Sequence, residues 1–148
     1  MRAILIDPEK QTFTPIEVGK NFREIQRALK CRSFTTGAWL KGSIEEGFDA
    51  IYASDDPLEE RDNPRFWFQV DADRNPPSSF PIAGLGLVLG ADKEGKSCDT
   101  RVTIEELAPR ITFSERKFRG FKVREYRDGI AVDVKAPIID GSQEKPRG

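Results

Sequence analysis

The spacing of hydrophobic and polar residues at the start of the chain predicts a β-hairpin. Residues 3–6 form a short apolar run, and residues 12–18 mix apolar and polar side chains across a polar turn at 7–10. Pro15 lies inside the second run and has no amide hydrogen to donate to a neighbouring strand. We therefore expect the second strand at a sheet edge or with a bulge.

An amphipathic helix follows the predicted hairpin. Asn21 suits the N-cap position, and Glu24 three residues later completes the pattern of a capping box. The apolar residues recur at helical spacing on one face, which we expect to be buried. These residues are Phe22, Ile25, Ala28 and Leu29.

Between residues 33 and 70 the apolar residues change to a period of two, which is typical of strands. A first strand is expected to place Phe34, Thr36, Ala38 and Leu40 on one side, and Thr35 and Trp39 on the other. Residues 47–53 predict a second strand. A third is expected to point Phe66, Phe68 and Val70 inward and Arg65, Trp67 and Gln69 outward.

The remaining chain predicts shorter elements. We expect a loop over 71–81, a buried strand over 84–90, a turn at 92–95 and a strand over 111–113. Thr103 and Glu106 predict a second capped helix, which Pro109 limits. Strands over 121–126 and 130–135 are expected to form a hairpin around Asp128-Gly129, with Tyr126 opposite Ala131 and Arg124 opposite Asp133.

These elements predict an α+β fold: a mostly antiparallel sheet, two short helices and an appended C-terminal β-hairpin. We divide the chain into a core domain at 1–117, a basic hairpin at 118–136 and a flexible tail at 137–148. The tail is rich in proline, glycine and charged residues.

Composition narrows the class of protein. The 148 residues favour one domain, and the 37% hydrophobic and 33% charged residues suit a globular chain with a well-solvated surface. The net charge of −1 gives no attraction of the whole molecule to nucleic acid or anionic membrane. The apolar runs are too short for a signal peptide or a membrane span, so we expect a cytoplasmic protein.

The chain contains no histidine, which excludes Ser-His-Asp and Cys-His catalysis and imidazole metal sites. Its two cysteines, Cys31 and Cys98, are far apart in the sequence and are expected to be reduced thiols that activity does not need. No spacing matches a zinc or calcium motif. We therefore assign no catalytic residue, metal or cofactor.

A glycine-rich segment with Gly84, Gly86 and Gly90 has two interpretations. Position 89 is leucine, so the dinucleotide fingerprint GxGxxG is not met. The glycines could allow close packing of a strand. Alternatively, the backbone could bind an anion together with nearby polar residues, which are Lys93, Lys96 and Ser97.

Two tryptophans suggest a second binding surface. Trp39 and Trp67 are predicted opposite the apolar stripes of their strands, with Arg65 beside Trp67. Exposed tryptophans are enriched in interaction hot spots. The same pattern also fits packing beneath a helix on the second face of the sheet.

A basic cluster near the C-terminus is the third candidate. Basic side chains beside an aromatic residue could bind phosphates and a stacked base. They could equally meet an acidic protein surface or simply face solvent. The residues are Arg116, Lys117, Arg119, Lys122, Arg124, Tyr126 and Arg127.

Three segments resemble small uncharacterised proteins of phages and mobile elements: residues 1–8, residues 81–95 with their glycines, and residues 103–107. The resemblance covers about residues 1–113. It implies an accessory protein that binds a host component in the host cytoplasm, either a defence protein, which it would inhibit, or a small nucleotide-like ligand. The alternatives are a nucleic-acid-binding accessory protein that uses the basic hairpin, and a small histidine-free enzyme. The oligomeric state stays open.

Overall fold

The computed structural model describes residues 1–43, 45–56, 66–72, 78–114, 118–127 and 130–139. In this part of the chain, two short α-helices accompany three antiparallel sheets. The predicted mostly antiparallel sheet and two short helices are thus confirmed. The division of the strands among separate sheets was not predicted.

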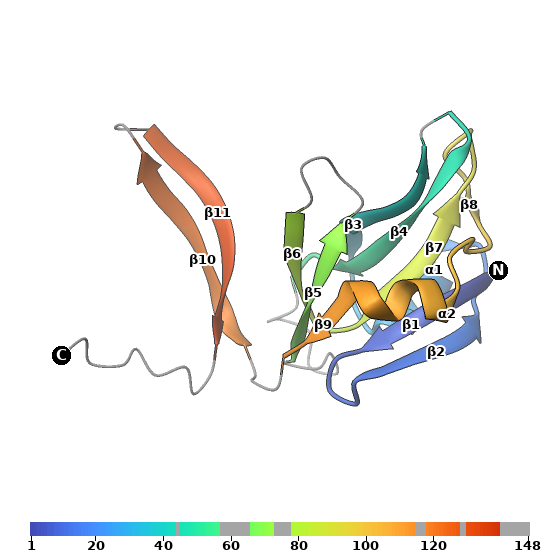
Figure 1. The fold of residues 1–148 in the computed structure, drawn as a ribbon, viewed down its shortest axis with the longest axis horizontal. Helices are drawn as coiled ribbons and strands as arrows, with labels where there is room; N and C mark the ends of the chain where they lie inside the picture. Colours follow the sequence, from blue (N-terminus) through green and yellow to red (C-terminus); the bar gives the residue numbers. More distant parts are fainter. Residues whose placement is uncertain (44, 57–65, 73–77, 115–117, 128–129, 140–148) are drawn as a thin grey trace.

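The largest sheet has six strands (Figure 1). Its strands are β1 (Arg2–Asp7), β2 (Thr12–Glu17), β3 (Phe34–Ser43), β4 (Gly47–Ser54), β7 (Gly86–Ala91) and the two-residue β8 (Ser97–Cys98). Their order is β2-β1-β7-β4-β3, and β8 pairs with β7. The predicted first hairpin is confirmed, and Pro15 lies on the edge strand β2, where its missing amide hydrogen costs no ladder bond.

A second sheet has the order β6-β5-β9, with strands β5 (Trp67–Ala72), β6 (Ser78–Ala83) and β9 (Ile111–Phe113). The predicted loop over 71–81 is wrong at both ends, because Asp71 and Ala72 belong to β5 and Ser78 to Pro81 belong to β6. Pro81 is accommodated because β6 is an edge strand. As predicted, Phe68 and Val70 point into the core.

The two sheets enclose the main core. It joins Ile4 and Ile6 of β1 and Val88 of β7 with Phe68 and Val70 of β5. A second cluster lies on the outer face of the large sheet, where helix α1 (Phe22–Leu29) packs through Ile25 and Leu29. The side chains of β1 alternate between these two clusters, because both faces of the large sheet are covered.

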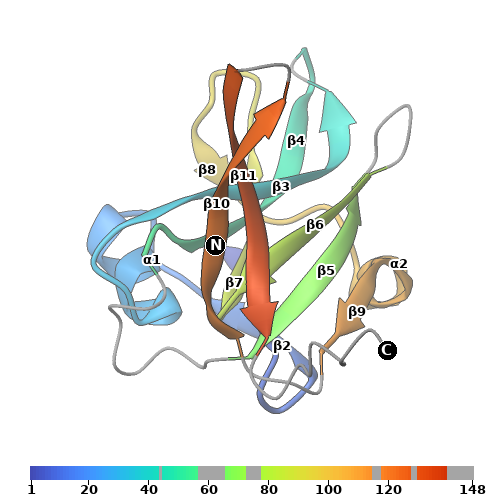
Figure 2. The ribbon, with the colours of Figure 1, turned by 90° about the vertical axis from the view of Figure 1, so that its left-hand side faces the viewer.

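The helices begin at the predicted caps. Asn21 Oδ1 accepts a bond of 2.9 Å from the Glu24 amide at the start of α1. Thr103 and Glu106 form the predicted capping box at α2 (Ile104–Leu107). The 3₁₀ helix η1 (Ala108–Arg110), which contains Pro109, follows α2. The two α-helices lie on opposite sides of the molecule (Figure 2).

Near the C-terminus, β10 (Phe118–Arg127) and β11 (Ile130–Ile139) form a two-stranded antiparallel sheet, of which only the backbone is described. The predicted register is confirmed: Tyr126 lies opposite Ala131, and Arg124 lies opposite Asp133. The turn predicted at Asp128-Gly129 is outside the described residues. β11 continues to Ile139, four residues beyond the predicted strand end, and thus includes the first three residues that we assigned to the tail.

Candidate functional site

A bulge reverses the direction of the side chains within β3. Thr36 pairs with Tyr52, but Ala38 pairs with Ile51, so Gly37 is an extra residue between them. An extra residue shifts the alternation of a strand by one position and moves the side chains that follow it to the other face. Here this holds until a second register shift, between Trp39 and Gly42. The predicted single stripe along this strand is therefore wrong.

The reversal has two consequences. Phe34 lies with the outer cluster beside α1, whereas Ala38 and Leu40 enter the core between the sheets. Trp39 pairs with Ala50, whose side chain points to the same outer side as its alternate neighbour Tyr52. The bulge thus puts Trp39 on the outer face of the large sheet together with Phe34.

Five aromatic residues gather on this side of the molecule, and we call them the aromatic face. They are Phe22, Phe34, Trp39, Phe48 and Tyr52. The Phe22 and Phe34 rings stack with their centroids 4.6 Å apart, and Phe34 meets Tyr52 edge-on at 6.0 Å. The ring centroids of Trp39 and Phe48 are 4.1 Å apart. The two spacings of Phe34 are those of favourable aromatic pairs, and the Trp39 and Phe48 rings lie closer still.

Two rings of the aromatic face are open to solvent. Phe22 is 54% exposed and Trp39 is 49% exposed. Phe22 was predicted to lie on the buried face of its helix. It is at the first position of α1, where it stacks on Phe34 instead of entering the core. Phe22, Phe34 and Phe48 were not predicted as site residues, although a glycine within an alternating strand, as at Gly37, is a known signal of a bulge.

The hydroxyl of Tyr52 titrates above its usual range. Burial raises the pKa of this phenol, and the Cys98 thiol acts in the same direction, against a hydrogen bond with the Thr36 side chain. The phenol therefore stays protonated at neutral pH. It can donate a hydrogen bond to a ligand but cannot act as a general base there.

The glycines and lysines predicted as one anion site lie at opposite ends of β7. Gly86 begins the strand, whereas Lys93 and Lys96 lie in the turn beyond its other end. A strand of this length separates them by roughly 20 Å. The predicted grouping is wrong, because an extended strand cannot bring its two ends together.

Several members of that predicted group have a structural role. A Cβ at Gly86 would lie 2.8 Å from Phe68 Cζ, so this glycine permits close packing of the two sheets. Gly84 turns the chain from β6 to β7 with φ of +79°, and its amide donates to the Phe66 carbonyl. Asp92 organises the predicted turn by accepting from the Lys96 amide, and Ser97 begins β8.

The two tryptophans lie in different sheets and do not form one face. Trp67 is in β5 and is half-buried, and its indole Nε1 has no hydrogen-bond acceptor among the residues described. Trp39 alone of the two is exposed. Arg65 is outside the described residues.

The basic cluster is placed only by its backbone. Arg119, Lys122, Arg124, Tyr126 and Arg127 all belong to β10, whereas Arg116 and Lys117 are outside the described residues. The register shift between Lys122 and Arg124 adds a residue to β11, so the alternation of β10 is kept at this point. Lys122, Arg124 and Tyr126 thus occupy alternate positions of one strand.

Other chemistry is sparse in the part of the chain that the structure describes. Cys31 and Cys98 are not joined in a disulfide. Within these ranges, no three acidic or cysteine side chains cluster closely enough to hold a metal ion. None of the helices described combines the length and hydrophobicity that crossing a membrane requires.

No family model, no curated protein and no solved structure matches this chain.

Proposed function

We propose that this protein is a non-catalytic binding protein that docks onto a partner protein through the aromatic face. One observation carries the proposal: Phe22 and Trp39, the large apolar side chains that stay exposed in the described part, both lie on the outer side of the large sheet, each against another aromatic ring. Exposed aromatic residues that cluster on one face are typical of protein interfaces.

The surface is suited to binding rather than catalysis. Trp39 rests on Phe48 and Phe22 rests on Phe34, so both exposed rings are held in place before a partner arrives. Rings that are already ordered lose little conformational entropy on binding. The chain has no histidine, and the phenol of Tyr52 is protonated at neutral pH, so the face supports no general-base chemistry of its own.

The resemblance of residues 1–113 to phage and mobile-element proteins supports a host protein as the partner, met in the host cytoplasm. In this setting the protein would inhibit a defence component by covering part of its surface. A small nucleotide-like ligand is the other host component that the resemblance implies. If such a ligand is bound, adding the right nucleotide should raise the melting temperature of the protein, and the nucleotide should not be consumed.

The test compares capture of host proteins by matched single variants. Wild-type protein and the control Thr35→Ala, an exposed position of the same strand, should retain the same partner. Trp39→Ala and Phe22→Ala should lose it while their circular dichroism spectra stay unchanged. With the purified partner, Trp39→Ala should raise the Kd by about 30-fold, since a hot-spot residue contributes at least about 2 kcal/mol. Unchanged capture by both variants would contradict the proposal.

A nucleic-acid-binding role for β10 and β11, as an appended hairpin, is the second candidate. Its specific support is that five of the seven basic-cluster residues occupy one strand, with Lys122, Arg124 and Tyr126 at alternate positions. This role predicts retention on heparin with a steep dependence on salt. The double charge reversal Lys122→Glu with Arg124→Glu should abolish that retention, whereas Trp39→Ala should leave it intact.

A further inference from the structure

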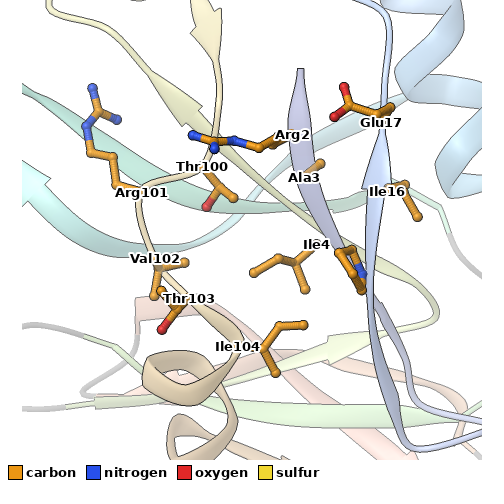
Figure 3. A pocket seen from close by; sticks show the side chains of 11 residues that line it. Arg2, Ala3, Ile4, Ile16, Glu17, Thr100, Arg101, Val102, Thr103 and Ile104 are labelled. Atoms are coloured by element: carbon orange, nitrogen blue, oxygen red, sulfur yellow. The ribbon is translucent and has the colours of Figure 1, made fainter.

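A groove separate from the aromatic face lies between the β1–β2 hairpin and the segment that leads into α2 (Figure 3). Its volume is about 480 Å³, which is within the usual range of small-molecule sites. Aliphatic side chains line much of it, with Ile4 and Val102 buried and Ile104 half-buried. An apolar body of moderate size fits such a lining.

The head of this groove carries charges of both signs. Arg2, Arg101 and Glu17 line it, and Glu17 Oε2 lies 3.5 Å from the Met1 ammonium nitrogen. Arg2 and Arg101 also line a second depression, to which Met1, Lys20 and Asp99 contribute. Figure 3 shows the Arg2 side chain extending toward Thr100 above the aliphatic residues. The groove therefore combines an apolar floor with one end at which the cations outnumber the carboxylates.

The guanidinium of Arg2 is available to a ligand. Its side chain is 71% exposed, and Nε lies 3.5 Å from Asp99 Oδ2. The closer contact to Asp99 comes from the Arg2 amide, which donates to Oδ1 at 2.8 Å. That amide bond is the main cause of the lowered pKa of Asp99. Because the amide holds Asp99, the guanidinium can turn to another anion at small cost, as expected of an exposed ion pair.

The opposite wall is fixed by a buried carboxylate. Asp49, fully buried, accepts from the Thr100 hydroxyl at 2.6 Å and from the amides of Arg101 and Val102 at 2.7 Å each. The Thr100 amide in turn donates to the Arg2 carbonyl at 3.0 Å. The wall is thus held against β1 before any ligand binds, which reduces the entropy lost on binding.

Arg101 has a different role from Arg2. Its Nη1 lies 3.3 Å from both Asp49 Oδ1 and the Phe48 carbonyl. A Cβ at Gly90 would lie 2.9 Å from this nitrogen, so the glycine leaves room for the guanidinium. Arg101 therefore balances the buried charge of Asp49, and the Met1 ammonium group lies beside Glu17. Arg2 and Lys20 share the single carboxylate of Asp99, which leaves an excess of one positive charge to meet a ligand.

From this arrangement we infer that the groove binds a small amphipathic anion: an aliphatic body on Ile4, Val102 and Ile104, and a phosphate or carboxylate group beside Arg2 and Lys20. This site is independent of the aromatic face, and it binds its ligand without chemical change. The aliphatic body alone contacts only the apolar floor, and the anionic group alone contacts only the charged head.

The test uses hexyl phosphate, with hexyl glucoside as a neutral probe of equal chain length and inorganic phosphate as a probe without the chain. Methyl resonances of Ile4, Val102 and Ile104 should shift saturably with hexyl phosphate. Hexyl glucoside lacks the charged group and inorganic phosphate lacks the aliphatic chain. Each should therefore bind at least about tenfold more weakly than hexyl phosphate.

Matched variants locate the charged contact. Arg2→Gln should raise the Kd for hexyl phosphate by about fivefold, as expected when one exposed charge pair is lost. Arg23→Gln removes an exposed arginine of α1 outside the groove and should leave the Kd unchanged. Both variants should keep the wild-type melting temperature within a few degrees.

Three results would overturn the inference. One is equal affinity for hexyl glucoside and hexyl phosphate, and another is equal loss of affinity in Arg2→Gln and Arg23→Gln. The third is a response confined to resonances of the aromatic face. Trp39 does not line the groove, so Trp39→Ala should still bind hexyl phosphate. Binding of hexyl phosphate by this variant therefore tests the groove alone, and loss of the protein partner tests the docking face alone.

Discussion

Gly86 and Phe68 fill complementary space between the two sheets: a Cβ on the glycine would lie 2.8 Å from Cζ of the fully buried phenylalanine. Gly86 is the first residue of the central strand β7, and Phe68 belongs to the middle strand of the smaller sheet. The size of one side chain therefore sets how closely the two sheets approach.

Gly86→Ala should lower the free energy of unfolding by about 1–3 kcal/mol, since an added methyl group overpacks a filled core. The measurement is urea denaturation followed by circular dichroism. Adding Phe68→Leu to the Gly86→Ala protein should cost less than Phe68→Leu alone, because the smaller side chain relieves the contact. Strict additivity of the two changes would show that the residues do not share this space.

Asp49 is expected to be among the most sensitive positions of the core. Asp49→Ala leaves the Thr100 hydroxyl, the amides of Arg101 and Val102 and the Arg101 guanidinium without their common acceptor. Loss of one partner of a buried charge pair costs about 3–5 kcal/mol. Thermal unfolding should show this loss, whereas Asp55→Ala, an exposed position at the end of β4, should change stability by less than about 0.5 kcal/mol.

The capping box of α2 predicts a dependence of stability on pH. The amide of Thr103 donates to Glu106 and, together with the ammonium group of Lys41, holds the pKa of this carboxyl below its ordinary value of 4.5. A carboxyl whose pKa is lower in the folded state stabilises the protein fully above the unfolded pKa. This contribution is lost as the pH falls through the folded pKa.

The urea midpoint of Glu106→Gln should therefore be below that of wild type at neutral pH. The difference should persist down to about pH 5 and shrink as the pH falls toward about 3. Glu105→Gln, an exposed change in the same helix, is the control. A difference between wild type and Glu106→Gln that stays constant down to the lowest pH would contradict this assignment.

The two tryptophans should differ in fluorescence. In Trp67→Phe, the remaining Trp39 should be strongly quenched by iodide, because it is 49% exposed. In Trp39→Phe, the half-buried Trp67 should be quenched less. Binding of a protein partner to the aromatic face should protect Trp39 from iodide. Protection of Trp67 alone would place the partner on the smaller sheet.

The sequence alone was sufficient wherever the signal and its structural effect lie within a few residues. Asn21 and Thr103 cap the helices that they precede, and the turn at Asp92 forms as its residues predict, because these bonds join near neighbours. The facing of Phe68 and Val70 also followed from alternation within one uninterrupted strand.

Only the tertiary structure decided how distant strands combine. Val88 pairs with Ile4 and Ile51 at once, and this pairing across long stretches of chain assigns β7 to the large sheet, whereas β5, β6 and β9 form another. The bulge at Gly37 then turned Trp39 to the outer face, and burial of Asp49 fixed the wall of the groove. Such choices depend on which surfaces meet in space, and the local periodicity of a strand carries no information about its partner.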